Sequence, residues 1–311
     1  MKKLTNLLLM ILLLSTVACD PSDDNDEEND NNEKEETEEF FTPEDKKVGL
    51  VLSGGGAKGA VEIGALKVIE RNNIKVDYIS GTSIGSIMGA LYSAGYTAQE
   101  LEDFFSSLDK EEAKKSSVIR EIVGKLLEAK GVSTFADLKI PFRCVTADTK
   151  ELKEVVLSEG SVLEAVMASS AIPYIYDNVK IDGHTYVDGG FYNNLPVDVV
   201  LDMGAEYTIV VDLRQDGESF VPPALEPAVK ALLKLPLTSE TVLGEARELV
   251  KVYYDTRPDL EKYEHNKTLA NNYIHPDLTG FNALSFGENN VKEMVKIGEK
   301  TAEIKLKIPQ E

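Results

Sequence analysis

Residues 47–85 read KVGLVLSGGGAKGAVEIGALKVIERNNIKVDYISGTSIG, and this stretch decides the fold of the chain. The short apolar run Val48 to Leu52 ends in three consecutive glycines, and an apolar pattern of helical period follows from Ala60 to Arg71. A second apolar segment, Val76 to Ile79, then runs into Gly81-Thr82-Ser83-Ile84-Gly85. This order predicts a βαβ unit with two loops at the carboxyl ends of its strands, where open α/β sheets bind ligands.

The second of these loops has the G-x-S-x-G form of a nucleophile elbow. A serine in such a turn stands between a strand and a helix, with its hydroxyl exposed and the helix N-terminus beneath it. Gly81 and Gly85 lack the side chains that would keep the strand and the helix apart. Because the helical run Ile84 to Leu91 follows as the motif requires, Ser83 is predicted to be a nucleophile.

The first loop, Gly54-Gly55-Gly56-Ala57-Lys58-Gly59, gathers backbone amides at the start of a helix. Such a nest attracts anions and could serve as an oxyanion hole. Lys58 could add positive charge there, or it could be a surface lysine in the first helical turn. The same string also fits G-x-G-x-x-G, the dinucleotide fingerprint. That interpretation needs an acidic residue at the far end of the second strand, whereas Asp77 opens this strand, so nucleotide binding is the weaker hypothesis.

Ser83 needs a general base, and the familiar serine triad would use a histidine. Of the three histidines, His184 lies in a polar turn, His265 in a charged stretch and His275 before a proline. None of these neighbourhoods suggests a catalytic imidazole. Asp188 is the better candidate, because its Val-Asp-Gly-Gly sequence follows an apolar strand where the strand opens into a loop. The alternative for Asp188 is an ordinary Asp-Gly turn.

The rest of the chain alternates between strand and helix patterns. Strand patterns lie at Pro141 to Thr146, Lys153 to Leu157, around Val179, and at Tyr186 to Asp188, Tyr207 to Asp212 and Asn271 to His275. Helix patterns lie at Thr97 to Ala129, Ser161 to Ser169, Leu195 to Met203, Pro227 to Tyr254 and Gly287 to Lys307. The alternation predicts an α/β fold with a mainly parallel central sheet of five or six strands flanked by helices. The last helix is expected to cover one face of this sheet.

The net charge of −21 is spread unevenly along the chain. Residues 1–19 carry +2 and residues 20–45 carry −13, which leaves −10 for residues 46–311. A moderately acidic body argues against nucleic acid as a partner, because nucleic-acid binding needs a basic surface. Residues 46–311 are long enough for one large domain, with a core at 48–212 and a largely helical C-terminal part at 213–311.

Residues 1–18 are predicted to be a signal peptide, with two lysines before the apolar core Leu7 to Leu14. Thr16-Val17-Ala18-Cys19 resembles a bacterial lipobox, although leucine is commoner than threonine in its first position. Cys19 is therefore predicted to carry acyl chains that anchor the protein in the cell envelope, at the outer membrane, with an ordinary cleaved signal as the alternative. Residues 19–45 are acidic and Asn-rich, which is typical of a disordered tether. They also resemble the export signals of some surface lipoproteins.

The sequence contains no HExxH, CxxC or EF-hand pattern, so neither a metal nor another cofactor is expected. Cys144, the only cysteine besides Cys19, lies in an apolar strand pattern and is expected to be a buried thiol without a disulfide partner.

Three motifs together resemble the patatin-like phospholipase family: SGGGAKGA at 53–60, GTSIG at 81–85 and DGG at 188–190. The segments ASSAIPYIYDNV, IDGHTYVDGG and NNLPVDVVLDMGAE resemble the joining text of the family, so the resemblance covers residues 48–212. The tail PDLTGFNALSFGENNVKEMVKIGEKTAE resembles the end of bacterial members. Tyr174 departs from the glycine that usually follows Ala-Ile-Pro.

This resemblance implies a three-layer α/β/α domain and a Ser–Asp dyad without a catalytic histidine. Ser83 would be the nucleophile and Asp188 the base. The amides of Gly54, Gly55 and Gly56 would form the oxyanion hole, with Lys58 in the basic position of the family. The expected function is hydrolysis of acyl esters in membrane lipids, as in a phospholipase A or a lysophospholipase. The alternative is a catalytically silent lipoprotein that binds a lipid or a protein partner.

Overall fold

Strand β1 (Val48–Leu52) lies in the middle of the sheet, and all five of its residues are buried. The computed structural model describes residues 45–173, 175–215, 227, 230–231, 233–234 and 247–306. The predicted signal peptide, Cys19, nearly all of the acidic tether and Tyr174 lie outside the described residues. Most of the predicted helix from Pro227 to Tyr254 also lies outside them.

Five parallel strands form the core of the sheet. β1 pairs with β2 (Tyr78–Thr82) on one side and with β7 (Tyr207–Val211) on the other. β3 (Phe142–Asp148) pairs with β2, and β8 (Asn272–Ile274) pairs with β7. The carboxyl ends of these strands therefore meet at one edge, as the βαβ pattern predicts.

Three further strands extend the sheet in antiparallel orientation on the side of β3. β4 (Lys153–Leu157) and β6 (His184–Asp188) pair with β3, and β5 (Val179–Ile181) pairs with β6. The described residues thus form an eight-stranded sheet with the order β5-β6-β3-β2-β1-β7-β8 and with β4 also on β3. The predicted count of five or six strands was wrong, because these short segments join the same sheet.

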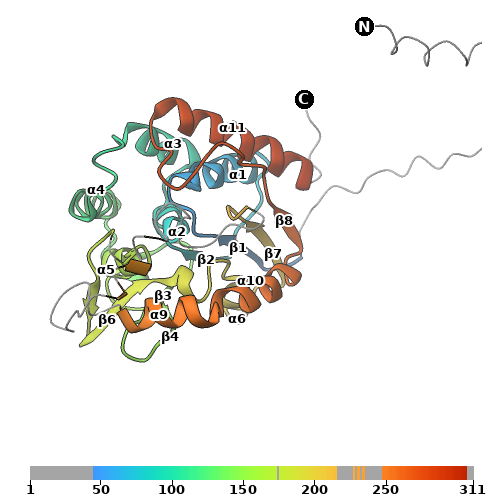
Figure 1. Cartoon of the computed structure of the whole chain (residues 1–311). Coiled ribbons are helices and arrows are strands. Elements are labelled where there is room, and N and C mark those ends of the chain that lie inside the picture. Colours follow the sequence, from blue (N-terminus) through green and yellow to red (C-terminus); the bar gives the residue numbers. More distant parts are fainter. Residues whose placement is uncertain are drawn as a thin grey trace, which may run out of the picture. The chain divides into compact units, whose positions relative to one another are not determined.

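Helices cover both faces of the sheet, which confirms the three-layer α/β/α architecture (Figure 1). One face carries α1 (Ala60–Arg71), α2 (Ile84–Ala94), α3 (Ala98–Ser107), α4 (Ser116–Ala129), α5 (Val162–Ser169) and α11 (Glu288–Lys305). The other face carries α6 (Val197–Asp202), α9 (Arg247–Thr256) and α10 (Pro258–Thr268). Three short 3-10 turns are η1 (Gly56–Gly59), η2 (Phe135–Asp137) and η3 (Gly189–Phe191).

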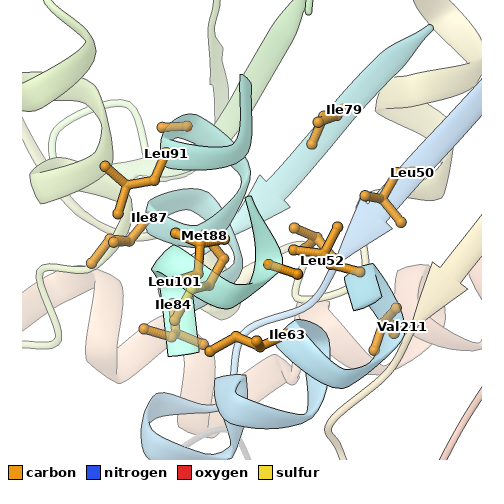
Figure 2. Packing of buried hydrophobic residues seen from close by; sticks show 14 of the residues in the cluster. Leu50, Leu52, Ile63, Ile79, Ile84, Ile87, Met88, Leu91, Leu101 and Val211 are labelled. Atoms are coloured by element: carbon orange, nitrogen blue, oxygen red, sulfur yellow. The ribbon is translucent and has the colours of Figure 1, made fainter. Parts of the chain in front are cut away.

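The largest apolar cluster joins β1, β2 and β7 to the helices α1, α2 and α3 on one face of the sheet (Figure 2). β1 contributes Leu50 and Leu52 to this cluster, α1 contributes Ile63 and α2 contributes Met88, and each of these side chains is fully buried. Ile84, the residue that follows the serine of the G-x-S-x-G motif, belongs to the same cluster. The start of α2 is thereby fixed against the core, which positions the turn before it.

Strand β2 begins later and ends later than the apolar pattern predicts. It starts at Tyr78 instead of Val76 and continues through Thr82. The reason is Asp77, whose backbone amide donates to the carbonyl of Val48 at 2.8 Å and whose carboxylate accepts from the Val48 amide at 3.0 Å. Asp77 therefore closes the start of β1, far from the edge where a ribose-binding acid would have to stand.

Helix α10 was not predicted from the sequence, although it carries clear start signals. Pro258 occupies its first turn, followed by the acidic residues Asp259 and Glu261, as is typical of a helix N-terminus. No helix among the described residues combines the length and the apolar character needed to cross a membrane.

Candidate active site

Ser83 stands on a strained turn between β2 and α2. Its backbone has φ 55° and ψ −124°, a conformation that costs a residue with a side chain about 1–3 kcal/mol. The turn is tight because its flanking glycines approach other backbone atoms. A Cβ atom on Gly85 would lie 2.2 Å from the carbonyl oxygen of Leu52, and one on Gly81 would lie 2.4 Å from the oxygen of Gly85. The predicted crowding of strand and helix is confirmed.

Buried hydrogen bonds hold this turn in place. The amide of Ser83 donates to Oγ of Ser169 at 2.9 Å, and Oγ of Ser169 donates to the carbonyl of Val145 at 2.6 Å. Oγ of Ser86 donates to the carbonyl of Ser83 at 2.6 Å. The side chain of Ser83 itself is left for chemistry, and the residue is 6% exposed. Sequence reasoning missed Ser169, because it belongs to no chemical motif and is far from Ser83 in the chain.

Asp188 lies at the carboxyl end of β6, fully buried. Its amide donates to the carbonyl of Ala171 at 3.0 Å, and its Oδ1 accepts from the amide of Gly190 at 2.8 Å. The Asp-Gly-Gly sequence does form a turn, and this turn also fixes the carboxylate. A Cβ atom on Gly189 would lie 2.3 Å from the carbonyl oxygen of Val145, so Gly189 allows the turn η3, directly after β6, to approach β3 closely.

The carboxyl group of Asp188 is well suited to accept a proton near neutral pH. Burial raises its pKa to about 7, against the hydrogen bonds from the Ser83 side chain and the Gly190 amide, which lower it. Oδ2 of Asp188 is buried and has no hydrogen-bond partner within the described part of the chain. The structure therefore brings Ser83 and Asp188 together and leaves one buried carboxylate oxygen open for a proton.

The glycine loop lies beside Ser83, and a Cβ atom on Gly54 would be 3.2 Å from Cβ of Ser83. Three amides of this loop have backbone acceptors: Gly54 donates to Asn194 at 3.2 Å, Ala57 to Ala283 at 3.0 Å and Lys58 to Gly55 at 3.3 Å. The amides of Gly55 and Gly56 have no acceptor within the described part of the chain. Of the three glycines predicted as oxyanion donors, these two are therefore the ones available.

Gly56 and Lys58 are both enclosed by their surroundings in the loop. Gly56 has φ +60°, and a Cβ atom there would lie 2.6 Å from the carbonyl oxygen of Ala283, so both its conformation and its contacts require glycine. Lys58 is only 3% exposed, which excludes its interpretation as a surface lysine. The segment around Ala283 packs against the loop from the C-terminal part of the chain.

The three histidines have partners away from Ser83. Nδ1 of His184 lies 2.6 Å from Oδ2 of Asp148, and Nε2 of His275 lies 2.5 Å from the carbonyl oxygen of Arg214. His265 lies in the last turn of α10, where its carbonyl accepts from Thr268 at 2.7 Å. None of these contacts brings an imidazole to the nucleophile.

Across the described ranges, no group of three or more histidine, cysteine, aspartate or glutamate side chains is placed to hold a metal ion. Cys144 is a free, buried thiol, as predicted, and burial raises its pKa. The arrangement at the sheet edge brings together the hydroxyl of Ser83, the buried carboxylate of Asp188 and two backbone donors.

Comparison with known proteins agrees with this geometry. The family model described as Patatin-like phospholipase matches residues 50–201, a range that includes Ser83 and Asp188. Patatin-like phospholipase domain-containing protein 6 of Homo sapiens is 33% identical over 192 residues, which cover 55% of this chain and 14% of the human protein. Lysophospholipase NTE1 of Mycosarcoma maydis is 29% identical over 182 residues, 53% of this chain and 10% of that protein. This chain thus matches a small part of much longer relatives.

A solved structure is similar in fold. VipD from Legionella pneumophila matches with a TM-score of 0.50 and 15% sequence identity, over 84% of this chain and 67% of that one. At this identity the likeness concerns the fold alone. It extends well beyond residues 50–201 and therefore includes C-terminal elements of this chain.

Proposed function

Residues 50–201 of this chain belong to the patatin-like phospholipase family, and we propose that the chain is a lipid acyl hydrolase with a Ser83–Asp188 dyad. One observation carries the proposal: the strained serine, a buried carboxylate with a pKa of about 7 and two open amides lie at one edge of the sheet. Nucleophilic acyl transfer requires these three parts. The dyad needs no histidine, and none contacts Ser83.

In the first half of the reaction, Oγ of Ser83 attacks the carbonyl carbon of the ester while Asp188 accepts the hydroxyl proton. The electron pair of the C=O bond moves to the oxygen, and the amides of Gly55 and Gly56 stabilise this oxyanion. Collapse of the tetrahedral intermediate breaks the bond to the leaving alkoxide, which takes the proton from Asp188. The product is an acyl ester on Ser83 and a free alcohol.

In the second half, water takes the place of the alcohol. Asp188 accepts a proton from the water as its oxygen attacks the acyl carbon, and the same two amides stabilise the second oxyanion. Collapse returns the proton to Oγ of Ser83 and releases a carboxylic acid. A pKa of about 7 suits both tasks, because a group acts best as base and acid when its pKa lies near the working pH.

The class of substrate follows from the relatives, since the proteins named phospholipase and lysophospholipase share this part of the chain. We therefore propose phospholipids or lysophospholipids as substrates, with a long acyl chain on the reacting ester. The test is turnover of chromogenic acyl esters and of lysophospholipid in detergent micelles by the full chain. Ser83→Ala and Asp188→Asn should each remove activity while circular dichroism stays that of the wild type.

The outcomes of this test separate the candidate functions. Full activity of a folded Asp188→Asn variant would show that the base lies elsewhere. A wild-type protein that is inert on every ester, in solution and in micelles, would favour a silent lipid-binding or partner-binding lipoprotein. As a control, Cys144→Ala should keep full activity, because this buried thiol takes no part in the reaction.

We also propose that acyl chains on Cys19 keep the hydrolase beside its substrate membrane in the cell envelope. The proposal rests on the apolar segment before Cys19 and on the lipobox-like Thr16-Val17-Ala18-Cys19. Two or three acyl chains suffice for stable anchoring. Mass spectrometry of the N-terminal peptide should show lipid on Cys19, and Cys19→Ala should leave the membrane fraction. An unmodified Cys19, or cleavage at another residue, would overturn it.

A further inference from the structure

The two open amides of the glycine loop belong to peptide units that are anchored in different ways. The amide of Gly56 shares a peptide unit with the carbonyl of Gly55, which accepts from the amide of Lys58 at 3.3 Å in the turn η1. The amide of Gly55 shares a peptide unit with the carbonyl of Gly54, which has its partner outside the loop. That partner is Nδ2 of Asn194, at 3.1 Å.

The bond from Asn194 fixes the direction in which Gly55 donates. The peptide units of the described chain are trans, so the C=O and N–H groups of one unit point in opposite directions. A donor that holds the carbonyl of Gly54 therefore holds the amide of Gly55 pointing away from Asn194. A hydrogen bond to the carbonyl also polarises the peptide unit and makes its N–H a stronger donor.

Two hydrogen bonds join Asn194 to Gly54. Its carbonyl accepts from the Gly54 amide at 3.2 Å while its side chain donates to the Gly54 carbonyl. The residue is 5% exposed, and a Cβ atom on Gly54 would lie 2.3 Å from Oδ1 of Asn194. The orientation of the Asn194 side-chain amide follows from its partner, the carbonyl oxygen of Gly54. A carbonyl oxygen can only accept a hydrogen bond, so it must face the NH₂ group of the side chain. Because Asn194 packs so closely on Gly54, position 54 has no space for a side chain.

We propose that Asn194 is a positioning residue of the oxyanion hole, acting through the peptide unit that joins Gly54 and Gly55. This inference rests on the proposed acyl hydrolase function. Asn194 follows Asp188 by six residues in the chain, so the loop that begins with the base also sets one of the two oxyanion donors. The buried position of its side chain keeps Asn194 from contact with the substrate, and its effect reaches the reaction through Gly55.

The test compares two esters that differ in one atom, an ordinary oxygen ester and the thionoester in which C=S replaces C=O. Sulfur accepts hydrogen bonds weakly, so the thionoester gains little from the oxyanion hole. Loss of a whole oxyanion donor lowers kcat about 10²–10³-fold, so misplacing one of two donors should lower it about tenfold or more. For Asn194→Ala in the full chain, kcat for the oxygen ester should fall by that amount with KM nearly unchanged.

The ratio of the oxygen-ester rate to the thionoester rate is the readout that a merely structural role would not move. It should fall about tenfold in Asn194→Ala, because the thionoester depends little on the hole. If both esters slow equally, or neither slows, the proposal is overturned. Asn194→Asp serves where the alanine variant does not fold, since its side chain has the same size but no N–H for the carbonyl of Gly54. Its negative charge acts on both esters and cancels in the ratio, so the ratio should fall in this variant as well.

Asn193→Ala is the matched control. Asn193 is also buried, and its side chain donates to Glu154 at 3.0 Å and to Asp198 at 2.9 Å instead of to the glycine loop. This variant should lose stability and keep the wild-type ratio of the two esters. A wild-type protein without activity on oxygen esters would overturn the proposed function itself. An active wild type whose ratio survives Asn194→Ala would overturn only the role of Asn194.

Discussion

The amide of Ser83 donates to the hydroxyl of Ser169 across 2.9 Å, and that hydroxyl donates in turn to the carbonyl of Val145 at 2.6 Å. One small side chain on α5 thus joins the serine turn to strand β3. All three residues are buried, so neither bond can be replaced by water from the surface. The positive φ of Ser83 needs such support, because a backbone in this region relaxes when its surroundings allow it.

Ser169→Ala should therefore lower both stability and activity. It leaves a buried N–H and a buried C=O without partners, which costs about 1–3 kcal/mol of unfolding free energy. The turn should also relax, so kcat for ester hydrolysis should fall together with the midpoint of urea unfolding. Ser170→Ala is the control, because Oγ of Ser170 donates only to the carbonyl of Val166 one helical turn earlier, at 2.8 Å. Equal effects of the two variants would argue against the support that Ser169 provides.

The rate of hydrolysis should depend on the ionisation of Asp188. Its pKa is raised to about 7, and only the carboxylate form can accept the proton of Ser83. The value of kcat/KM should therefore rise about tenfold per pH unit below the pKa and reach a plateau above it. A pH profile from 5 to 9 measures this, with a lysophospholipid whose charge does not change over that range. A flat profile between pH 5 and pH 8 would contradict a base with this pKa.

The local part of the fold was predictable from the sequence because it depends on near neighbours. The βαβ unit, with its helix from Ala60 to Arg71, and the helix start next to Thr97 both appear where the pattern places them. The predictions for Ser83 and Asp188 rest on the same kind of local pattern. Each stands next to glycines at the end of an apolar strand, and such a position carries its own local signal.

The supporting residues were not predictable, because their partners are remote in the sequence. Ser169 is 86 residues from Ser83, and Asn194 is 140 residues from Gly54. Nothing near either residue indicates which amide or carbonyl it will meet. For the same reason the sequence does not indicate which of the three glycine amides are available as oxyanion donors. The amide of Gly54 is not available, because it donates to the carbonyl of Asn194.

Glu62 should make stability depend on pH. Its carboxylate oxygens are buried without hydrogen-bond partners, and burial raises its pKa well above the ordinary value. The unfolded chain ionises this group above a pH of about 4.3, whereas the folded chain keeps the proton, so unfolding free energy falls as pH rises toward the folded pKa. Glu62→Gln removes this loss. Relative to wild type, the variant should gain stability between pH 5 and pH 8 in urea unfolding.

The comparison between these two proteins isolates Glu62, because Asp188 titrates in both and its contribution cancels. Only one proton is involved, so the gain cannot exceed about 1.4 kcal/mol per pH unit. If wild type and Glu62→Gln lose or gain stability in parallel over this range, the carboxyl group does not stay protonated in the folded protein.

Gly85→Ala should abolish activity, because the new methyl group has no space. Its Cβ atom would lie 2.2 Å from the carbonyl oxygen of Leu52, and backbone on both sides would have to move apart. That movement shifts the start of α2 and with it the hydroxyl of Ser83, so kcat should fall by at least about 10²-fold, as for a misplacement of about 1 Å.

Gly124→Ala in α4 is the matched control, since its nearest neighbour is only the end of the Leu163 side chain, at 3.2 Å. There alanine should keep full activity and stabilise the helix by up to about 1 kcal/mol. Ester turnover and thermal unfolding of the two variants decide the matter, and an active Gly85→Ala enzyme would mean that the turn at Ser83 tolerates a wider separation of strand and helix.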